Sequence, residues 1–174
     1  MMAVRVRRCY DRAMRLSDVR AARPEDLRTV LTLLRELAEY EKLTHEVVFD
    51  DDEFGRHMFG ERPMVDVLLA DCGGEAVGFA LFYHDFSTFM GKPGVYLEDI
   101  FVRPAHRGHG HGKALISAVA AVAVERGCAR MKWSVLDWNQ PAIDFYRSLG
   151  AEPMDEWTVW RISGESLTRL ARRE

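Results

Sequence analysis

The stretch GVYLEDIFVRPAHRGHGHGKAL, residues 94–115, contains the features that decide the fold. Residues 94–102 are rich in β-branched and aromatic side chains and predict a strand, which Pro104 ends. Three glycines then alternate with basic and imidazole side chains between residues 108 and 112. Apolar residues recur at helical spacing from Leu115 to Val122. The order of strand, glycine-rich turn and helix predicts a mixed α/β domain.

Periodicity and turn residues predict further strands and helices on both sides of this stretch. The expected strands cover residues 18–22, 64–72, 75–84, 130–138 and 157–163. The expected helices begin near Pro24 and Pro141, lie within residues 50–60, and end the chain over residues 165–173. Gly55 and Gly60 are expected to break the second helix, and Gly73-Gly74 joins two strands.

The composition is that of an ordinary globular protein. The 174 residues are 48% hydrophobic and 29% charged, and they fit one domain with a sizeable core. A net charge of -3 argues against a nucleic-acid binder. The apolar run from Ala114 to Val124 is too short to span a membrane. Three scattered cysteines suit a reducing compartment, so we expect a cytoplasmic protein.

The first eighteen residues differ from the rest of the chain. They contain five arginines without sustained periodicity. A targeting peptide is one reading, but an apolar segment is missing and Asp11 is unfavourable. We expect residues 1–18 to be a disordered extension, or to precede a start near Met14, and residues 19–174 to form the domain.

The glycine-rich turn fails both familiar nucleotide motifs. A P-loop needs Gly where Arg107 stands and Ser or Thr where Ala114 stands, and the dinucleotide fingerprint needs a different glycine spacing. Glycines can still turn successive N–H groups toward one anion at the start of a helix. Arg103, Arg107 and Lys113 add positive charge, so a diphosphate fits, although the glycines could simply form a tight connection.

The histidines of this turn raise the question of a metal. His106, His109 and His111 lie close in sequence, but no cysteine or carboxylate completes a ligand set within the loop. Solvated histidines beside an anion site are therefore expected, and no metal.

Several motifs, in order, resemble one family. VRPAHRGHGHGKAL resembles the acetyl-coenzyme A loop of the GNAT N-acetyltransferases, with matches at Arg107, Gly110 and Gly112. ELAEYEKL, FGERP, YLEDIFV and VLDWNQPAIDFYRSLGA resemble its diamine acetyltransferase branch, which includes thialysine N-epsilon-acetyltransferases. The likeness runs from about Val19 to the last helix.

The resemblance implies a mixed, strongly twisted sheet flanked by helices, with central strands 97–102 and 131–136 splayed apart around acetyl-coenzyme A as cosubstrate. It implies that the pantetheine arm pairs with Ile100, Phe101 and Val102. It places the remaining cofactor-binding positions at Arg107, Gly108, His109, Gly110, His111, Gly112, Lys113, Asn139, Gln140, Pro141, Ala142 and Tyr146.

The chemistry of amine acetylation needs a base, because a lysine-type amine has a pKa of ~10.4 and arrives protonated. The resemblance makes Glu98 the candidate base and Tyr146 the partner of the departing thiolate. Spacing alone also allows Tyr146 to be a packing residue. In a regular strand Glu98 and Asp99 point to opposite faces, and the choice of Glu98 rests on the resemblance.

The resemblance also implies the substrate contacts, at Tyr40, Glu41, Glu98, Lys132, Trp133, Ser134 and Glu156. Ser87, Thr88 and Phe89 stand where diamine enzymes carry an acidic residue, which favours a thialysine-like amine over a diamine or polyamine. The branch commonly forms homodimers through a last strand, here Trp157–Ile162. Two alternatives stay open, an acyl-coenzyme A sensor without activity and a protein-tail acetyltransferase.

Overall fold

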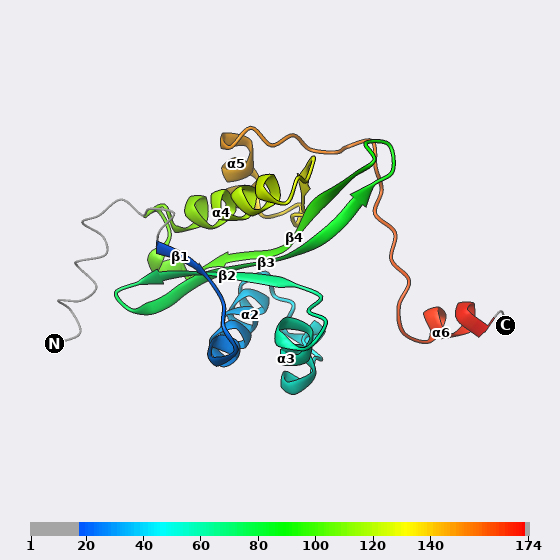
Figure 1. Ribbon diagram of the computed structural model, residues 1–174, viewed down its shortest axis with the longest axis horizontal. Coiled ribbons are helices and arrows are strands. Elements are labelled where there is room, and N and C mark those ends of the chain that lie inside the picture. The colour runs from blue at the N-terminus through cyan, green and yellow to red at the C-terminus, as the bar shows by residue number, and fades with distance from the viewer. Residues whose placement is uncertain (1–17, 173–174) are drawn as a thin grey trace. The chain divides into compact units, whose positions relative to one another are not determined.

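The computed structural model describes residues 18–172 (Figure 1). The expectation of a disordered extension falls almost entirely on residues 1–17, outside this range. The chain divides into two compact units at Ser134 and Val135, and each unit is described by itself. The prediction of a single domain over residues 19–174 stays a prediction.

The first unit is built on a five-stranded mixed sheet with the order β1-β2-β3-β4-β5. Its strands are β1 (Val19–Ala21), β2 (Asp66–Cys72), β3 (Glu75–Ser87), β4 (Lys92–Val102) and β5 (Met131–Lys132). The first four strands pair antiparallel, and β5 runs parallel to β4. The Gly73-Gly74 turn joins β2 to β3 as predicted, and the predicted fold class is confirmed.

Helices cover both faces of the sheet. The helices α2 (Leu27–Glu41) and α3 (Asp51–Phe59) lie on one face, and α4 (His111–Glu125) lies on the other (Figure 1). Short 3-10 turns occur at Pro24–Asp26, Thr44–Glu46 and Pro104–His106. Beneath α2, a core of apolar residues excludes water from the centre of β3, where Phe79 is fully buried.

Two expectations for the first unit are wrong. Gly55 does not break α3, which runs through it and ends at Gly60. A Cβ atom at Gly55 would approach Leu27 Cδ2 to 2.8 Å, so glycine there lets α3 pack closely against α2. The strand expected over residues 130–138 pairs only at Met131 and Lys132. The pairing with β4 therefore ends opposite Tyr96.

The second unit contains α5 (Gln140–Ser148) and α6 (Gly164–Arg172), close to the predicted helices. Asn139 caps α5 by accepting a hydrogen bond from the Ala142 N–H at 3.4 Å. The strand expected over residues 157–163 is absent from this described unit, where that segment is extended but unpaired. Across residues 18–172, no helix has both the length and the apolarity that a bilayer crossing requires. The cytoplasmic location stays a prediction.

Candidate active site

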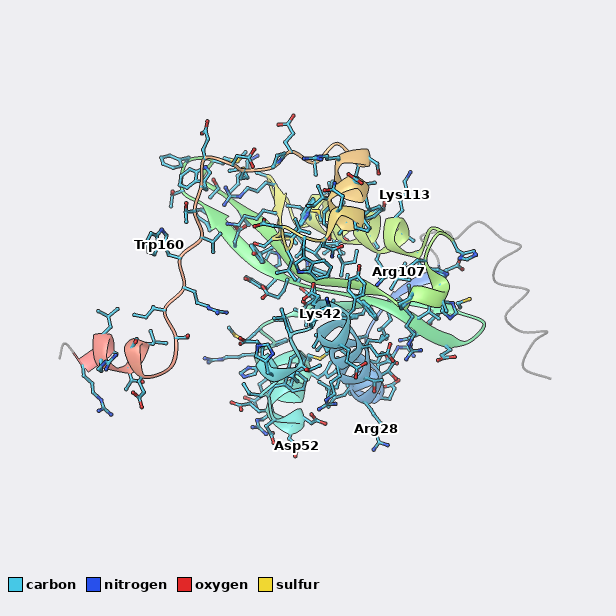
Figure 2. The ribbon with its side chains drawn as sticks, turned by 180° about the vertical axis from the view of Figure 1, so that it is seen from behind. Arg28, Lys42, Asp52, Arg107, Lys113 and Trp160 are labelled. Carbon is cyan, nitrogen blue, oxygen red and sulfur yellow. The ribbon has the colours of Figure 1, made fainter. Side chains whose placement is uncertain are left out.

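The loop between β4 and α4 has the geometry expected of an anion site. Gly108 and Gly110 have φ values of 77° and 90°, in the left-handed region that favours glycine. Gly110 is the N-cap of α4, so the first N–H groups of a 15-residue helix open into this loop. Arg107, His109 and Lys113 are exposed, and Lys113 extends away from the helix (Figure 2). Gly112 lies in the first turn.

Arg103 does not belong to this site, contrary to the prediction. Its guanidinium donates to Glu36 at 2.8 and 2.9 Å and to Glu75 at 2.7 Å. Since two carboxylates already hold this charge, Arg103 ties the end of β4 to α2 and β3 instead.

Arg107 links the loop to the end of α2. Its Nε donates to the Val102 carbonyl at 2.9 Å, and its guanidinium carbon lies 4.2 Å from the Tyr40 ring centroid. The Phe101 ring is 5.7 Å away. A cation over an aromatic face is attracted to its quadrupole, so Arg107 and Tyr40, both expected in the site, are brought together.

His111 is not the solvated histidine that was expected. It is 2% exposed, and burial, followed by the charges of His106 and His109, lowers its pKa. Neither imidazole nitrogen of His111 has a hydrogen-bond partner among residues 18–172. Cys72 of β2 also comes close, with Sγ of Cys72 and ring nitrogens of His106 and His111 within 4.8 Å of one another, but Cys72 is disulfide-bonded and offers no free thiolate. Sequence spacing could not reveal this cysteine, because it lies 34 positions before His106.

Glu98 occupies a β-bulge. Leu81 of β3 pairs with Asp99 and Phe82 pairs with Leu97, so Glu98 has no partner position on β3. Such an extra residue interrupts the alternation of side chains along a strand. Glu98 itself is exposed.

The bulge interrupts the alternation of side chains at Glu98 and Asp99. Tyr83 lies two positions from Leu81, the partner of Asp99, and therefore shares the face of Asp99. Burial, followed by the charge of Glu98, raises the pKa of Tyr83, and the charge of Glu98 also acts on Asp99. The prediction of opposite faces assumed a regular strand, which the bulge interrupts.

Three carboxyl groups interact through their charges at Asp99. Burial raises the pKa of Asp99 to about 7, and the charges of Glu98 and Glu41 act in the same direction. Burial also raises the pKa of Glu41, at the end of α2. A cation placed here would relieve their repulsion, so the cluster is suited to an ammonium group. The role of Asp99 was missed because its burial depends on α2 packing.

The remaining predicted substrate residues of the first unit lie at β5 and just beyond it. Lys132 Nζ lies 2.7 Å from Asp85, so an ion pair engages its side chain. The Ser134 hydroxyl shares a hydrogen bond of 2.9 Å with the Tyr96 hydroxyl. Trp133 is partly buried.

The other predicted residues belong to the second unit. The Tyr146 ring packs 5.5 Å from Phe145 on α5. Gln140 Nε2 donates to Asp144 at 2.7 Å, and Pro141 lies in the first turn of the same helix. Glu156 is exposed, in the segment between α5 and α6.

The β4–α4 loop suits an anionic ligand, and the carboxyl groups of β4 and α2 suit an amine. The chain belongs to the acetyltransferase (GNAT) family, whose model matches residues 28–151. It is thus an acetyltransferase, and enzymes of this family use acetyl-coenzyme A as cosubstrate.

The chain is also similar to individual named proteins over most of its length. The chain is 40% identical over 164 residues to a thialysine N-epsilon-acetyltransferase of Bos taurus, covering 88% of this chain and 96% of the relative. It is 31% identical to an L-ornithine N5-acetyltransferase of Arabidopsis thaliana, covering 88% and 87%. A solved integron cassette protein from the mobile metagenome of V. cholerae superposes with a TM-score of 0.74, at 25% identity and with coverage of 88% and 96%.

Proposed function

We propose that this enzyme acetylates the side-chain amine of a lysine-like amino acid, thialysine first, with a diamine or polyamine as the second choice. The observation that carries the proposal is the action of the Glu98 and Glu41 charges on Asp99, on the strand that leads into the β4–α4 loop. The names of the relatives favour the same class of amine.

The carboxyl cluster suits both binding and deprotonation. An amine with a pKa of ~10.4 arrives as a cation, which Glu41 and Asp99 attract. Glu98, directly or through water, accepts one proton, and the neutral nitrogen attacks the thioester carbon. Nitrogen–carbon bond formation is followed by cleavage of the carbon–sulfur bond, which expels the coenzyme A thiolate. The nitrogen loses its second proton to water, and Tyr146 donates to the thiolate either a hydrogen bond or a proton that it regains from water. The reaction then proceeds by direct transfer in a ternary complex, without a metal.

The β4–α4 loop is the proposed holder of the diphosphate. The left-handed Gly108 and Gly110 and the open start of α4 support this, with Arg107 and Lys113 supplying charge. A Cβ atom at Gly108 would meet nothing within 4 Å, which leaves room for a ligand. The backbone of residues 100–102 and residues 139–142 of the second unit complete the proposed cofactor contacts.

The tip of the β3–β4 hairpin supports the choice of a lysine-like amine over a polyamine. The Ser87 hydroxyl is buried and accepts a hydrogen bond from the Met90 N–H at 3.3 Å. The turn therefore has a neutral side chain at its base, where an acidic one would attract a second ammonium group.

The proposal includes a homodimer formed through residues 157–162. Trp157, Val159 and Trp160 are 68%, 85% and 89% exposed, and the side chain of Trp160 stands off the chain (Figure 2). An extended segment with aromatic side chains is suited to pairing with a second copy. Sedimentation velocity tests this, since Trp160→Ser should shift the protein toward the monomer, and an unshifted dimer would exclude this segment.

The central experiment measures release of coenzyme A thiol from acetyl-coenzyme A. The amines are thialysine, lysine, ornithine, putrescine, spermidine and a histone-tail peptide, with a control lacking amine. We expect the highest kcat/KM with thialysine. A preference for spermidine would show that the substrate is a polyamine and not a lysine-like amino acid. A response to the peptide alone would show that the enzyme is a protein acetyltransferase.

A further inference from the structure

Two cations at the start of β5 share one carboxylate of β3. Lys132 Nζ lies 2.7 Å from Asp85 Oδ2, and Arg130 Nη2 donates to the same oxygen at 3.0 Å. Among residues 18–172, neither cation pairs with a second carboxylate. Burial opposes the ionisation of Asp85, but the contacts with Lys132 and Arg130 outweigh it and lower the pKa of Asp85. These three side chains together therefore carry one positive charge in excess.

Lys132 is the member of this group that can contact a ligand. Its side chain is 46% exposed, whereas that of Asp85 is 15% exposed. Asp85 Oδ1 is buried and has no hydrogen-bond partner within the described chain, so both cations contact the other oxygen. An ammonium group has three N–H donors, and the contact with Asp85 uses one of them. The other donors of Lys132 can therefore bind an anion.

The three side chains lie in line with Asp99 along the sheet. Leu81 pairs with Asp99, and Asp85 lies four positions further along β3, so Asp85 and Asp99 share a face. Four residues of a strand cover about 13 Å. An extended thialysine measures about 8 Å from its side-chain nitrogen to its α-carboxyl carbon, and a hydrogen bond at each end adds about 3 Å. A lysine-like amino acid therefore spans the distance from Asp99 to Lys132.

An aromatic pair lies between the two ends. Tyr83 lies midway between Leu81 and Asp85, and it stacks on its cross-strand neighbour Tyr96 with ring centroids 5.3 Å apart. Lys132 Nζ is 5.7 Å from the Tyr96 ring centroid, so the cation adjoins this pair. Aromatic rings make favourable contacts with thioether sulfur and with apolar groups. The sulfur and methylene groups of a bound thialysine thus have an apolar surface to lie on.

We propose that Lys132, with Arg130 beside it on Asp85, binds the α-carboxylate of the amino-acid substrate while the side-chain amine lies at Asp99. The proposal rests on the proposed function and deepens it, because it makes the α-carboxylate a part of the substrate that the enzyme recognises. A diamine lacks this group and would bring a second ammonium toward an excess of positive charge. The subsite therefore favours amino acids over diamines.

The first test compares thialysine with its primary amide, in which a neutral group replaces the carboxylate. The wild-type kcat/KM should be about tenfold lower for the amide, the size of a hydrogen bond between charged groups. Lys132→Gln should lower kcat/KM for thialysine about tenfold through KM, and it should change the value for the amide less than about twofold. Equal losses with both substrates would overturn the proposal.

Charge variants at the same position sharpen the test. Lys132→Arg keeps the charge and should keep the preference for thialysine over the amide. Lys132→Glu should make bis(2-aminoethyl) sulfide, the diamine analogue of thialysine, the better substrate, and an unchanged preference would contradict the proposal. The matched control is Arg28→Gln, which removes an exposed cation of α2 that points away from the sheet and should leave each kcat/KM unchanged (Figure 2).

A binding measurement separates this proposal from the proposed function. Isothermal titration with thialysine uses the enzyme saturated with coenzyme A, from which no acetyl group can be transferred. Lys132→Gln should weaken thialysine binding about tenfold and leave the Kd for coenzyme A unchanged. A weaker Kd for coenzyme A, with thialysine binding unaltered, would assign Lys132 to the cofactor and overturn the subsite.

The two proposals fail in different ways. If thialysine binds through Lys132 but is not acetylated, the proposed reaction alone is wrong. If thialysine is acetylated and Lys132→Gln leaves its KM and its binding unchanged, the carboxylate subsite alone is wrong. If thialysine neither binds nor reacts, both proposals are wrong.

Discussion

The β4–α4 loop and the carboxyl cluster suit ligands of opposite charge and are built in different ways. The loop takes its shape from left-handed glycines and a helix start within residues 103–113, and its cations are exposed. The cluster assembles side chains from α2 and from the β4 bulge, and burial raises the pKa of Asp99 to about 7. An anion site can therefore be local and open, whereas the cation site depends on tertiary packing.

This difference predicts how substitutions act. Changes in the loop should affect affinity for acetyl-coenzyme A, because the loop is the proposed holder of its diphosphate. Changes in the cluster should affect turnover and its dependence on pH, because its carboxyl groups interact with one another and with the amine.

The largest effect should come from Glu98→Gln. Loss of the base should lower kcat by about 100-fold or more, while the Kd for acetyl-coenzyme A stays unchanged. Stopped-flow acetyl transfer and isothermal titration measure the two quantities. The matched control is Glu125→Gln, an exposed carboxylate on α4. Wild-type turnover in E98Q would show that Glu98 is not the base and would make Asp99 the next candidate.

Tyr146→Phe tests a group that belongs to neither region. Loss of the donor to the departing thiolate should lower kcat by about tenfold and leave Kd for acetyl-coenzyme A nearly unchanged. Turnover assays and titration with acetyl-coenzyme A measure this. The ring still packs on Phe145, so retained full activity would show that Tyr146 serves packing alone.

Arg107→Ala should weaken the binding of acetyl-coenzyme A to the loop. Removing a charged contact to the diphosphate should raise the Kd for acetyl-coenzyme A by about tenfold. The matched control is Arg103→Ala, which loses its bonds to Glu36 and Glu75 and should lower the Tm without changing this Kd. Equal affinity losses in both variants would contradict the assignment of Arg107.

The smallest effect should come from Asp99→Asn, and it should appear as a change in how KM and stability depend on pH. The folded-state pKa of about 7 lies above the ordinary value of 3.8, so Asp99 contributes stability below pH 3.8 that is lost as pH rises through 7. Substrate ammonium favours the ionised form, so the KM for thialysine should fall as pH rises from 6 to 8.

In the D99N variant, this fall in KM should disappear, and at pH 8 KM should be about fivefold above wild type, since one charge contact is lost. Thermal melts at pH 5 and pH 8 complete the test. The Tm of D99N should fall less than the Tm of the wild type between pH 5 and pH 8. An unchanged KM profile would show that Asp99 does not face the amine.

Much of the fold could be predicted from local signals. The β2–β3 hairpin follows from two apolar runs around Gly73-Gly74, and the helices follow from apolar spacing. The strand expected over residues 130–138 forms only at Met131 and Lys132, and the one expected over residues 157–163 does not form, because strand propensity does not specify a partner. Gly55 was misread for a related reason, since its close neighbour, Leu27, is distant in sequence.

The parts of the candidate site also differ in how far they could be predicted from local sequence. The loop could be predicted because its glycines and cations lie within residues 103–113, although the bonds that engage Arg103 come from β3 and α2. Of the cluster, Glu41 and Glu98 were predicted only by resemblance and Asp99 was not predicted, because the register around Glu98 is set between strands.

The bulge at Glu98 has a consequence for how this enzyme can be altered genetically. Because Asp99 still pairs with Leu81 and Leu97 with Phe82, Glu98 lies outside the pairing that packs the sheet. An in-frame deletion of this one codon leaves a regular strand in which every other side chain keeps its face. The gene could thus gain or lose its proposed base in a single event while the fold is preserved.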